Sequence, residues 1–208
     1  MPKKLLCFGD SNTYGYRYYD RGRFDSDTRW TGILSKLLMP YGVNVIESGL
    51  NSRTTVFDYA AKPDKNGSKA LPNILKETCP DYVIIMLGTN DCKTEFHATP
   101  DMIVNGLDII VKQVKHFDSR IKIILVCPAF IDKTVLSHSF SDSFDENSIL
   151  RSAMLENMIR SLADENECIF LSAAGVADTS HTDGIHLNEK GHAALAKTLF
   201  ECILEKLL

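Results

Sequence analysis

The sequence predicts an α/β fold, a three-layer α/β/α sandwich built on a five-stranded parallel sheet. Five short apolar runs rich in β-branched residues recur along the chain, and longer segments with apolar residues at helical spacing lie between most of them. The runs carry few polar positions, which is typical of strands that helices cover on both faces. Strands of this kind belong to parallel sheets.

The predicted strands occupy residues 3–8, 44–47, 82–87, 122–127 and 168–172. Helices are expected at residues 30–39, 102–117, 149–165 and 189–207. Thr28 lies upstream of the first helix, and Pro100 and Asp101 open the second with residue types that favour helix starts.

Length and composition indicate a single domain over residues 1–208. With 44% hydrophobic and 24% charged residues, the chain has the composition of a globular protein. Its net charge is −4 and its basic residues form no stripe, so we expect no nucleic-acid partner. No stretch has the length of a membrane span, and the apolar run after Lys4 is too short for a signal peptide. We therefore expect a cytoplasmic protein.

The six cysteines contain no Cys-x-x-Cys pair, and three of them lie inside predicted strands. This pattern favours reduced core residues over a disulfide framework or a zinc site. The cysteines are Cys7, Cys79, Cys92, Cys127, Cys168 and Cys202.

Polar side chains follow three of the predicted strands. Gly9-Asp10-Ser11-Asn12 follows the first, residues 48–51 follow the second, and Gly88-Thr89-Asn90-Asp91 follows the third. The carboxyl ends of parallel strands meet at one edge of the sheet, where ligand sites form. Ser11 is a candidate nucleophile at a sharp turn for which Gly9 supplies conformational freedom. Taken alone, a serine that follows Gly-Asp is more often a helix cap or a turn residue than a nucleophile.

A second motif, Asp183-Gly184-Ile185-His186, lies just before the last predicted helix. One turn of chain places the Asp183 carboxylate against the His186 imidazole, leaving the other ring nitrogen for Ser11. A lone histidine there is usually structural, and Asn188 beside it fits an N-cap. The combination of a serine at a strand end with a paired histidine favours nucleophilic catalysis.

Gly49 and Asn90 are candidate donors to an oxyanion. The Gly49 N–H is free of side-chain obstruction, and the Asn90 amide and the Ser11 N–H add two further donors. Alternatively, Gly49 is a turn residue and Asn90 binds the backbone of its own loop.

In their order and spacing, Gly9-Asp10-Ser11, Gly49, Gly88-Thr89-Asn90-Asp91 and Asp183-Gly184-Ile185-His186 resemble the four blocks of the SGNH (GDSL-type) hydrolases. The resemblance implies a flavodoxin-like fold, a catalytic triad of Ser11, His186 and Asp183, and an oxyanion hole of Ser11, Gly49 and Asn90. It implies no metal and no organic cofactor.

Flanking segments at residues 29–32, 49–55 and 83–91 are similar to the bacterial arylesterase and acyltransferase (perhydrolase) branch, and carbohydrate acetylesterases are close relatives. This resemblance implies hydrolysis of small acyl esters, possible acyl transfer to alcohol or peroxide, and a homo-oligomer. The sequence departs from that branch in having Tyr14 and Tyr16 in place of tryptophans, Asn51 in place of a small residue, and a shorter loop at residues 17–28.

Other residues and alternatives stay open. Asp10 and Asp91 are expected to support the loops of the site by hydrogen bonds. Arg53 either holds a loop or neighbouring subunit or is solvated, and Trp30 is expected to pack a helix. Residues 130–144 form a lid, a subunit interface or an ordinary loop.

Three other functions compete with a short-chain esterase. They are a carbohydrate acetylesterase or lysophospholipase-type enzyme, a catalytically weak binding member of the fold, and a metal-dependent phosphate hydrolase using Asp10, Asp91 and Asp183.

Overall fold

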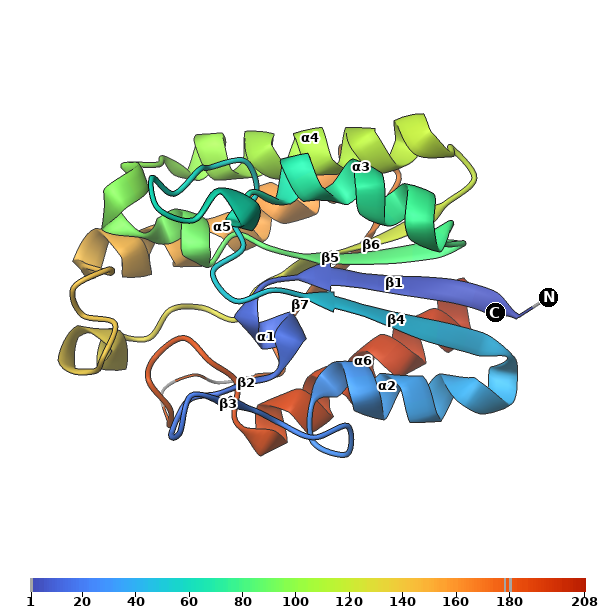
Figure 1. Cartoon of the computed structure of the whole chain (residues 1–208), viewed down its shortest axis with the longest axis horizontal. Helices are drawn as coiled ribbons and strands as arrows, with labels where there is room; N and C mark the ends of the chain where they lie inside the picture. Colours follow the sequence, from blue (N-terminus) through green and yellow to red (C-terminus); the bar gives the residue numbers. More distant parts are fainter. Residues whose placement is uncertain (1, 178, 180) are drawn as a thin grey trace.

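The predicted sandwich is present in the computed structural model, which describes residues 2–177, 179 and 181–208 (Figure 1). A parallel sheet has the strand order β4-β1-β5-β6-β7, the order of flavodoxin-like folds. Its strands are β1 (Lys3–Gly9), β4 (Val43–Gly49), β5 (Tyr82–Met86), β6 (Lys122–Cys127) and β7 (Ile169–Ser172). The fold prediction is therefore confirmed.

Helices cover both faces of the sheet, as Figure 1 shows. Helices α2 (Trp30–Leu38) and α6 (Glu189–Lys206) pack on one face. The other face carries α3 (Gly67–Thr78), α4 (Pro100–Phe117) and α5 (Glu146–Glu165). Two apolar cores result, one on each side of the central strands, and this explains why those strands carry so few polar residues.

The remaining elements are short. They are α1 (Ser11–Tyr14), the hairpin strands β2 (Tyr16–Arg17) and β3 (Gly22–Arg23), and 3₁₀ turns at Met39–Tyr41, Pro63–Lys65, Asn90–Cys92, Thr94–Phe96 and Lys133–Ser137.

The caps explain where several helices begin. Helix α4 starts at Pro100, and the Thr99 side chain accepts a hydrogen bond from the Met102 N–H. Helix α5 begins three residues before the predicted start, because Asp145 and Ser148 form a capping box. Thr28 does not cap α2, whose N-cap residue is Arg29 and makes no side-chain capping bond.

The prediction that all six cysteines lie in the core is wrong for half of them. Cys7, Cys92 and Cys127 are buried, whereas Cys79 is exposed at the end of α3 and the remaining two are half-buried. Cys79 lies at the end of α3 and Cys202 lies on α6. The apolar pattern of the sequence alone does not show which ends and faces of these helices are buried.

Candidate active site

Ser11 lies at the first position of α1, immediately after β1. The Asp10 side chain caps this helix by accepting a hydrogen bond from the Asn12 N–H at 2.9 Å. Gly9 was expected to supply conformational freedom for a turn, but its φ is not positive. It is required because a Cβ would lie 2.0 Å from Thr13 Oγ1 and 2.8 Å from the Met86 carbonyl oxygen. Close packing at the strand end therefore explains the glycine.

The structure brings together the three residues predicted to form a triad. His186 Nε2 lies 2.9 Å from Ser11 Oγ, across 175 positions of sequence, and His186 Nδ1 lies 2.7 Å from Asp183 Oδ2. The other Asp183 oxygen accepts the backbone N–H groups of Ile185 and His186 at 3.1 and 2.9 Å. All three triad side chains are buried.

The charge on Asp183 is stabilised locally. Burial acts to raise its pKa, but the hydrogen bonds from the His186 ring and the two backbone amides prevail and hold the pKa of Asp183 below its ordinary value. An ionised carboxylate against Nδ1 fixes the tautomer that leaves Nε2 free to accept a proton from Ser11.

Asn12 joins the two halves of this arrangement, and the sequence analysis missed it. Its amide nitrogen donates to the Ile185 carbonyl at 3.1 Å, and its amide oxygen accepts the Leu187 N–H at 3.0 Å. Both bonds reach the backbone on either side of His186. The Trp30 indole N–H donates to the Asn12 carbonyl at 3.0 Å, so Trp30 is a packing residue that also holds this turn.

Gly49 ends β4 directly opposite Gly9 in the parallel register. A Cβ at Gly49 would lie 2.1 Å from the Tyr14 backbone nitrogen, so only glycine lets β4 approach the backbone of α1 this closely. Gly49 thus ends beside the helix that carries Ser11.

Asn90 lies in the same pocket as Ser11 and His186. Its amide nitrogen donates to the Arg53 carbonyl at 3.2 Å and lies 3.5 Å from Asp10 Oδ2. Asn90 therefore binds a neighbouring loop. The alternative interpretation expected it to bind the backbone of its own loop. The longer of the two Asn90 contacts is a weak hydrogen bond, which a ligand in the pocket can replace.

Arg53 is buried, which rules out the solvated alternative. Its Nη1 donates to the Gly9 carbonyl at 2.8 Å and to the Ser48 carbonyl, and the guanidinium lies 4.4 Å from the centre of the Phe8 ring. Ser48 C=O and Gly49 N–H belong to one planar peptide, so holding the carbonyl also orients the N–H. Arg53 therefore fixes β1, β4 and Asn90 relative to one another.

Asp10 and Asp91 are fully buried carboxyls with shifted pKa values. Burial raises the pKa of each to about 6. Asp91 accepts hydrogen bonds from the Thr55 N–H, at 2.9 Å, and from the Thr55 hydroxyl. Asp91 therefore holds the segment after β4, which is one of the loops of the site.

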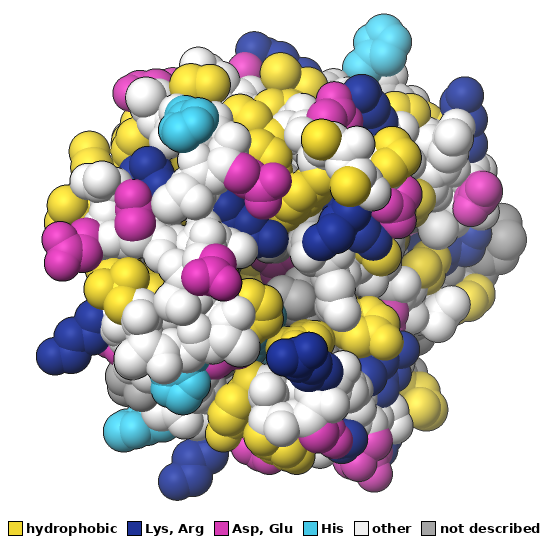
Figure 2. Space-filling view, turned by 60° about the vertical axis from the view of Figure 1, so that its left-hand side comes forward, with side chains coloured by type: hydrophobic (Ala, Val, Ile, Leu, Met, Phe, Trp, Pro, Cys, Tyr) yellow, Lys and Arg dark blue, Asp and Glu magenta, His cyan; other side chains and the backbone are white. Residues whose placement is uncertain are grey.

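The pocket beside Ser11 has a volume of about 200 Å³. The Tyr16 and Phe140 rings lie 4.4 and 5.5 Å from the His186 ring, between centroids. Figure 2 turns this end of the molecule forward and shows a hollow near its middle, bordered by hydrophobic and by Lys and Arg side chains. The lining residues are Ser11, Tyr16, Asn51, Ser52, Asn90, Lys93, Phe140, Phe144, Ile185 and His186.

Two of the residues at which the sequence departs from the arylesterase and acyltransferase branch lie at the pocket. Tyr16 and Asn51 line the pocket, whereas the ring of Tyr14 stacks under the Arg23 guanidinium at 4.6 Å. Residues 130–144 supply one wall through Phe140 and Phe144, and Phe144 is anchored in the core. This segment is therefore part of the pocket in the present conformation.

The metal-dependent alternative finds no support in the described part of the chain. Asp10, Asp91 and Asp183 bind three different sets of protein donors, and no three potential ligands among these residues gather at one point. Every helix within residues 2–177, 179 and 181–208 is also too short or too polar to cross a bilayer.

A serine, histidine and aspartate joined in this order recur in serine hydrolases of unrelated folds. The sequence matches the GDSL-like Lipase/Acylhydrolase family over residues 7–194, so the chain belongs to this family.

Relatives with known structures match over nearly the whole chain. An aryl esterase from M. smegmatis is 34% identical, with a TM-score of 0.90 and coverage of 99% of this chain and 100% of that one. A carbohydrate acetylesterase from Sinorhizobium meliloti is 32% identical, with a TM-score of 0.90 and coverage of 98% and 99%. An arylesterase from Vibrio mimicus is 29% identical over 60% of this chain, and the matched segment spans 54% of that protein.

Proposed function

We propose that this protein is a serine esterase that hydrolyses carboxylic esters of short acyl groups, with Ser11 as nucleophile, His186 as general base and Asp183 as its orienting partner. The proposal is supported above all by His186, whose two ring nitrogens lie 2.9 Å from Ser11 Oγ and 2.7 Å from Asp183 Oδ2. The family membership and the esterase relatives point to the same chemistry.

In this mechanism Ser11 Oγ attacks the ester carbonyl while His186 Nε2 takes its proton. The oxyanion of the tetrahedral intermediate accepts hydrogen bonds from the Ser11 N–H, the Gly49 N–H and the Asn90 amide. His186 then gives its proton to the departing alcohol, leaving an acyl-enzyme. Water attacks the acyl group by the same proton path in reverse and releases the acid.

The substrate class follows from the size of the pocket and from the relatives. A volume of about 200 Å³ suits a short acyl group better than a long chain. The M. smegmatis and Sinorhizobium meliloti relatives are an aryl esterase and a carbohydrate acetylesterase. Acetyl-type esters of a small aromatic or sugar alcohol are therefore our first substrates, and a lysophospholipase-type activity is a weaker alternative.

Acyl transfer to an alcohol or peroxide is a further part of the proposal. The Tyr16 and Phe140 rings pack beside His186, and we expect them to restrict the access of water to the acyl-enzyme. We also propose that the protein is cytoplasmic and that it forms a homo-oligomer. Exposed Leu150 and Met154 on α5 supply apolar surface suited to self-association, and light scattering of the purified protein measures the assembly.

Hydrolysis of p-nitrophenyl esters from acetate to octanoate tests the function. Wild type, Ser11→Ala and the control Ser161→Ala, which alters an exposed serine of α5, are compared with and without chelator. We expect short esters to be cleaved by wild type and control at equal rates, and Ser11→Ala to lose about 10⁴-fold or more in kcat. Equal rates for wild type and a folded Ser11→Ala would disprove the assignment of the nucleophile. Loss of activity with chelator would restore the metal-dependent alternative.

A further inference from the structure

A buried lysine lines the same pocket as Ser11. Lys93 directly follows the 3₁₀ turn Asn90–Cys92, and the residue is only 8% exposed. Its ammonium group donates to the Tyr59 hydroxyl at 3.0 Å. The centres of the Tyr59 and Phe144 rings lie 5.0 and 5.9 Å from Nζ, so two aromatic side chains border the ammonium group.

The Lys93 ammonium group has more hydrogen-bond donors than the described residues provide acceptors for. An ammonium carries three donors. Within residues 2–177, 179 and 181–208, the Tyr59 hydroxyl is its one hydrogen-bond acceptor, and no carboxylate lies at ion-pair distance. Burying a cation without a paired anion costs free energy in the folded protein. A bound anion would offset this cost.

Burial and several nearby charges act on the pKa of Lys93 in opposite directions. Burial lowers the pKa of Lys93, and Lys62 acts in the same direction. Glu95, Asp10 and Asp91 oppose this effect at longer range and favour the ammonium form. The ammonium form of Lys93 places a positive charge at the wall of a small pocket, where a ligand can supply the missing anion.

A second polar group of the wall also lacks a partner. The side-chain oxygen of Asn51 is buried and accepts no hydrogen bond from the described residues. Rotation of the amide by half a turn presents its nitrogen in place of the oxygen, so Asn51 can either donate to or accept from a bound molecule.

We propose that Lys93 forms a subsite for a carboxylate carried by the substrate, so that the preferred substrates are small esters with an anionic group close to the scissile bond. This inference rests on the proposed esterase function. A carboxylate supplies both the opposite charge and two acceptor oxygens, whereas a neutral substrate leaves the buried ammonium with Tyr59 alone. The acyl and alcohol parts of an ester both pass near Ser11, and the experiment distinguishes which part carries the anion.

Two matched substrate pairs test the subsite. Mono-p-nitrophenyl glutarate and p-nitrophenyl pentanoate differ by a carboxylate on the acyl side. O-acetylglycolate and O-acetylglycolamide differ by a carboxylate on the alcohol side. For each pair, the ratio of kcat/KM for the charged ester to kcat/KM for the neutral ester is measured in wild type, Lys93→Met, Lys93→Arg and Tyr59→Phe.

We expect wild type to prefer the charged member of one pair. Lys93→Met should lower that ratio about tenfold or more, because it keeps the length of the side chain and removes its charge. Lys93→Arg should retain part of the preference, and the control Tyr59→Phe should retain most of it, because it removes the hydroxyl but not the ammonium.

Two results would overturn the subsite. One is a wild-type preference for the neutral member of both pairs, which does not depend on any variant folding. The other is an unchanged ratio in a folded Lys93→Met, which would make Lys93 a structural partner of Tyr59. Failure of the esterase proposal has a different signature, because wild type would then hydrolyse neither neutral nor charged esters.

Discussion

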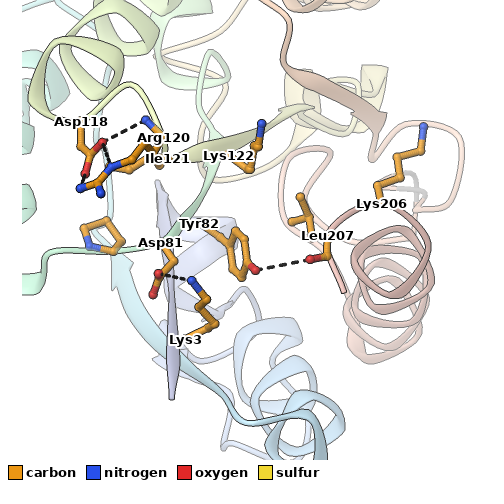
Figure 3. Close-up of a pocket in the computed structure, with 10 residues that line it drawn as sticks. Lys3, Asp81, Tyr82, Asp118, Arg120, Ile121, Lys122, Lys206 and Leu207 are labelled. Atoms are coloured by element: carbon orange, nitrogen blue, oxygen red, sulfur yellow. Dashed lines mark hydrogen bonds and ion pairs between the residues drawn. The ribbon is translucent and has the colours of Figure 1, made fainter. Parts of the chain in front are cut away.

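The two ends of the sheet both carry a hollow, but they are built in opposite ways. At the carboxyl end, the pocket of about 200 Å³ is lined by Ser11, His186 and Asn90, whose polar atoms are buried and bound in fixed directions. At the amino end, a larger groove of about 410 Å³ is lined by exposed ion pairs (Figure 3).

The groove at the amino end shows that an open hollow alone does not indicate a functional site. Lys3 Nζ lies 2.8 Å from Asp81, and Arg120 Nη2 lies 2.7 Å from Asp118 (Figure 3). The Lys3 and Arg120 side chains are 55% and 89% exposed, so water competes for both pairs. Directional, buried polar contacts therefore identify the functional end of this sheet better than volume does.

Among substitutions outside Ser11, His186 and Asp183, the largest effect that would sharpen this comparison is expected at Asn90. Asn90→Ala removes one proposed donor to the oxyanion and should lower kcat about 10²–10³-fold, with a smaller change in KM. Steady-state kinetics with p-nitrophenyl acetate measure the loss, and circular dichroism checks the fold. Turnover within twofold of wild type in a folded protein would remove Asn90 from the oxyanion hole.

A smaller loss is expected for Asn12→Ala, because Asn12 positions the His186 segment without reaching the substrate. The variant loses two buried hydrogen bonds to the backbone around His186, which should lower the free energy of unfolding by about 1–3 kcal/mol. We expect kcat to fall about tenfold, in parallel with the rate at which a fluorophosphonate labels Ser11. Asn105→Ala, on the exposed face of α4, is the control. A drop in stability with unchanged labelling would limit Asn12 to a structural role.

The buried carboxyl of Asp91 predicts a dependence of stability on pH. Its pKa is raised from 3.8 to about 6 in the folded protein, so the folded state holds the proton more tightly than the unfolded chain. The resulting stabilisation is complete below the ordinary pKa and is lost as pH rises through about 6. From pH 4 to 7, wild type should therefore lose about 1–3 kcal/mol relative to Asp91→Asn.

Urea unfolding at several pH values measures this difference, and Asp142→Asn, at an exposed carboxylate, provides the control. Parallel pH profiles for wild type and Asp91→Asn would mean that Asp91 titrates like an ordinary aspartate.

The smallest effect is expected at the opposite end of the sheet. Lys3→Ala breaks an exposed ion pair and should shift the melting temperature by less than about 2 °C, leaving kcat/KM unchanged within twofold. Differential scanning fluorimetry and the p-nitrophenyl acetate assay measure both. A marked loss of activity would show that the two ends are coupled and would contradict the contrast drawn between them.

The sequence predicted every strand of the parallel sheet and four of its covering helices, because apolar periodicity reports directly on which faces are buried. Helix α3 was missed because Gly67 opens it and Pro72 lies inside it, and both residue types weaken a helical pattern. The 3₁₀ turns and the β2–β3 hairpin are too short to carry a period of their own.

The candidate site was predictable for a different reason. Parallel topology brings strand ends together, so Ser11, Gly49 and Asn90 were expected at one edge without knowledge of any contact. The contacts themselves were not predictable. Asn12 binds backbone groups near His186, and Lys93 pairs with Tyr59, and neither partnership has a local sequence pattern because each depends on the register between distant segments.

The hydrogen bonds from Ser11 to His186 and from Leu187 to Asn12 each join residues that lie 175 positions apart in the sequence. This separation determines when the site can form during synthesis of the chain. A chain growing on the ribosome carries its proposed nucleophile from the first turn, but it has no base until the segment around His186 has emerged and docked. Ester cleavage by this protein would therefore begin only when its amino-terminal and carboxyl-terminal parts meet, which makes catalytic competence a direct reporter of completed folding.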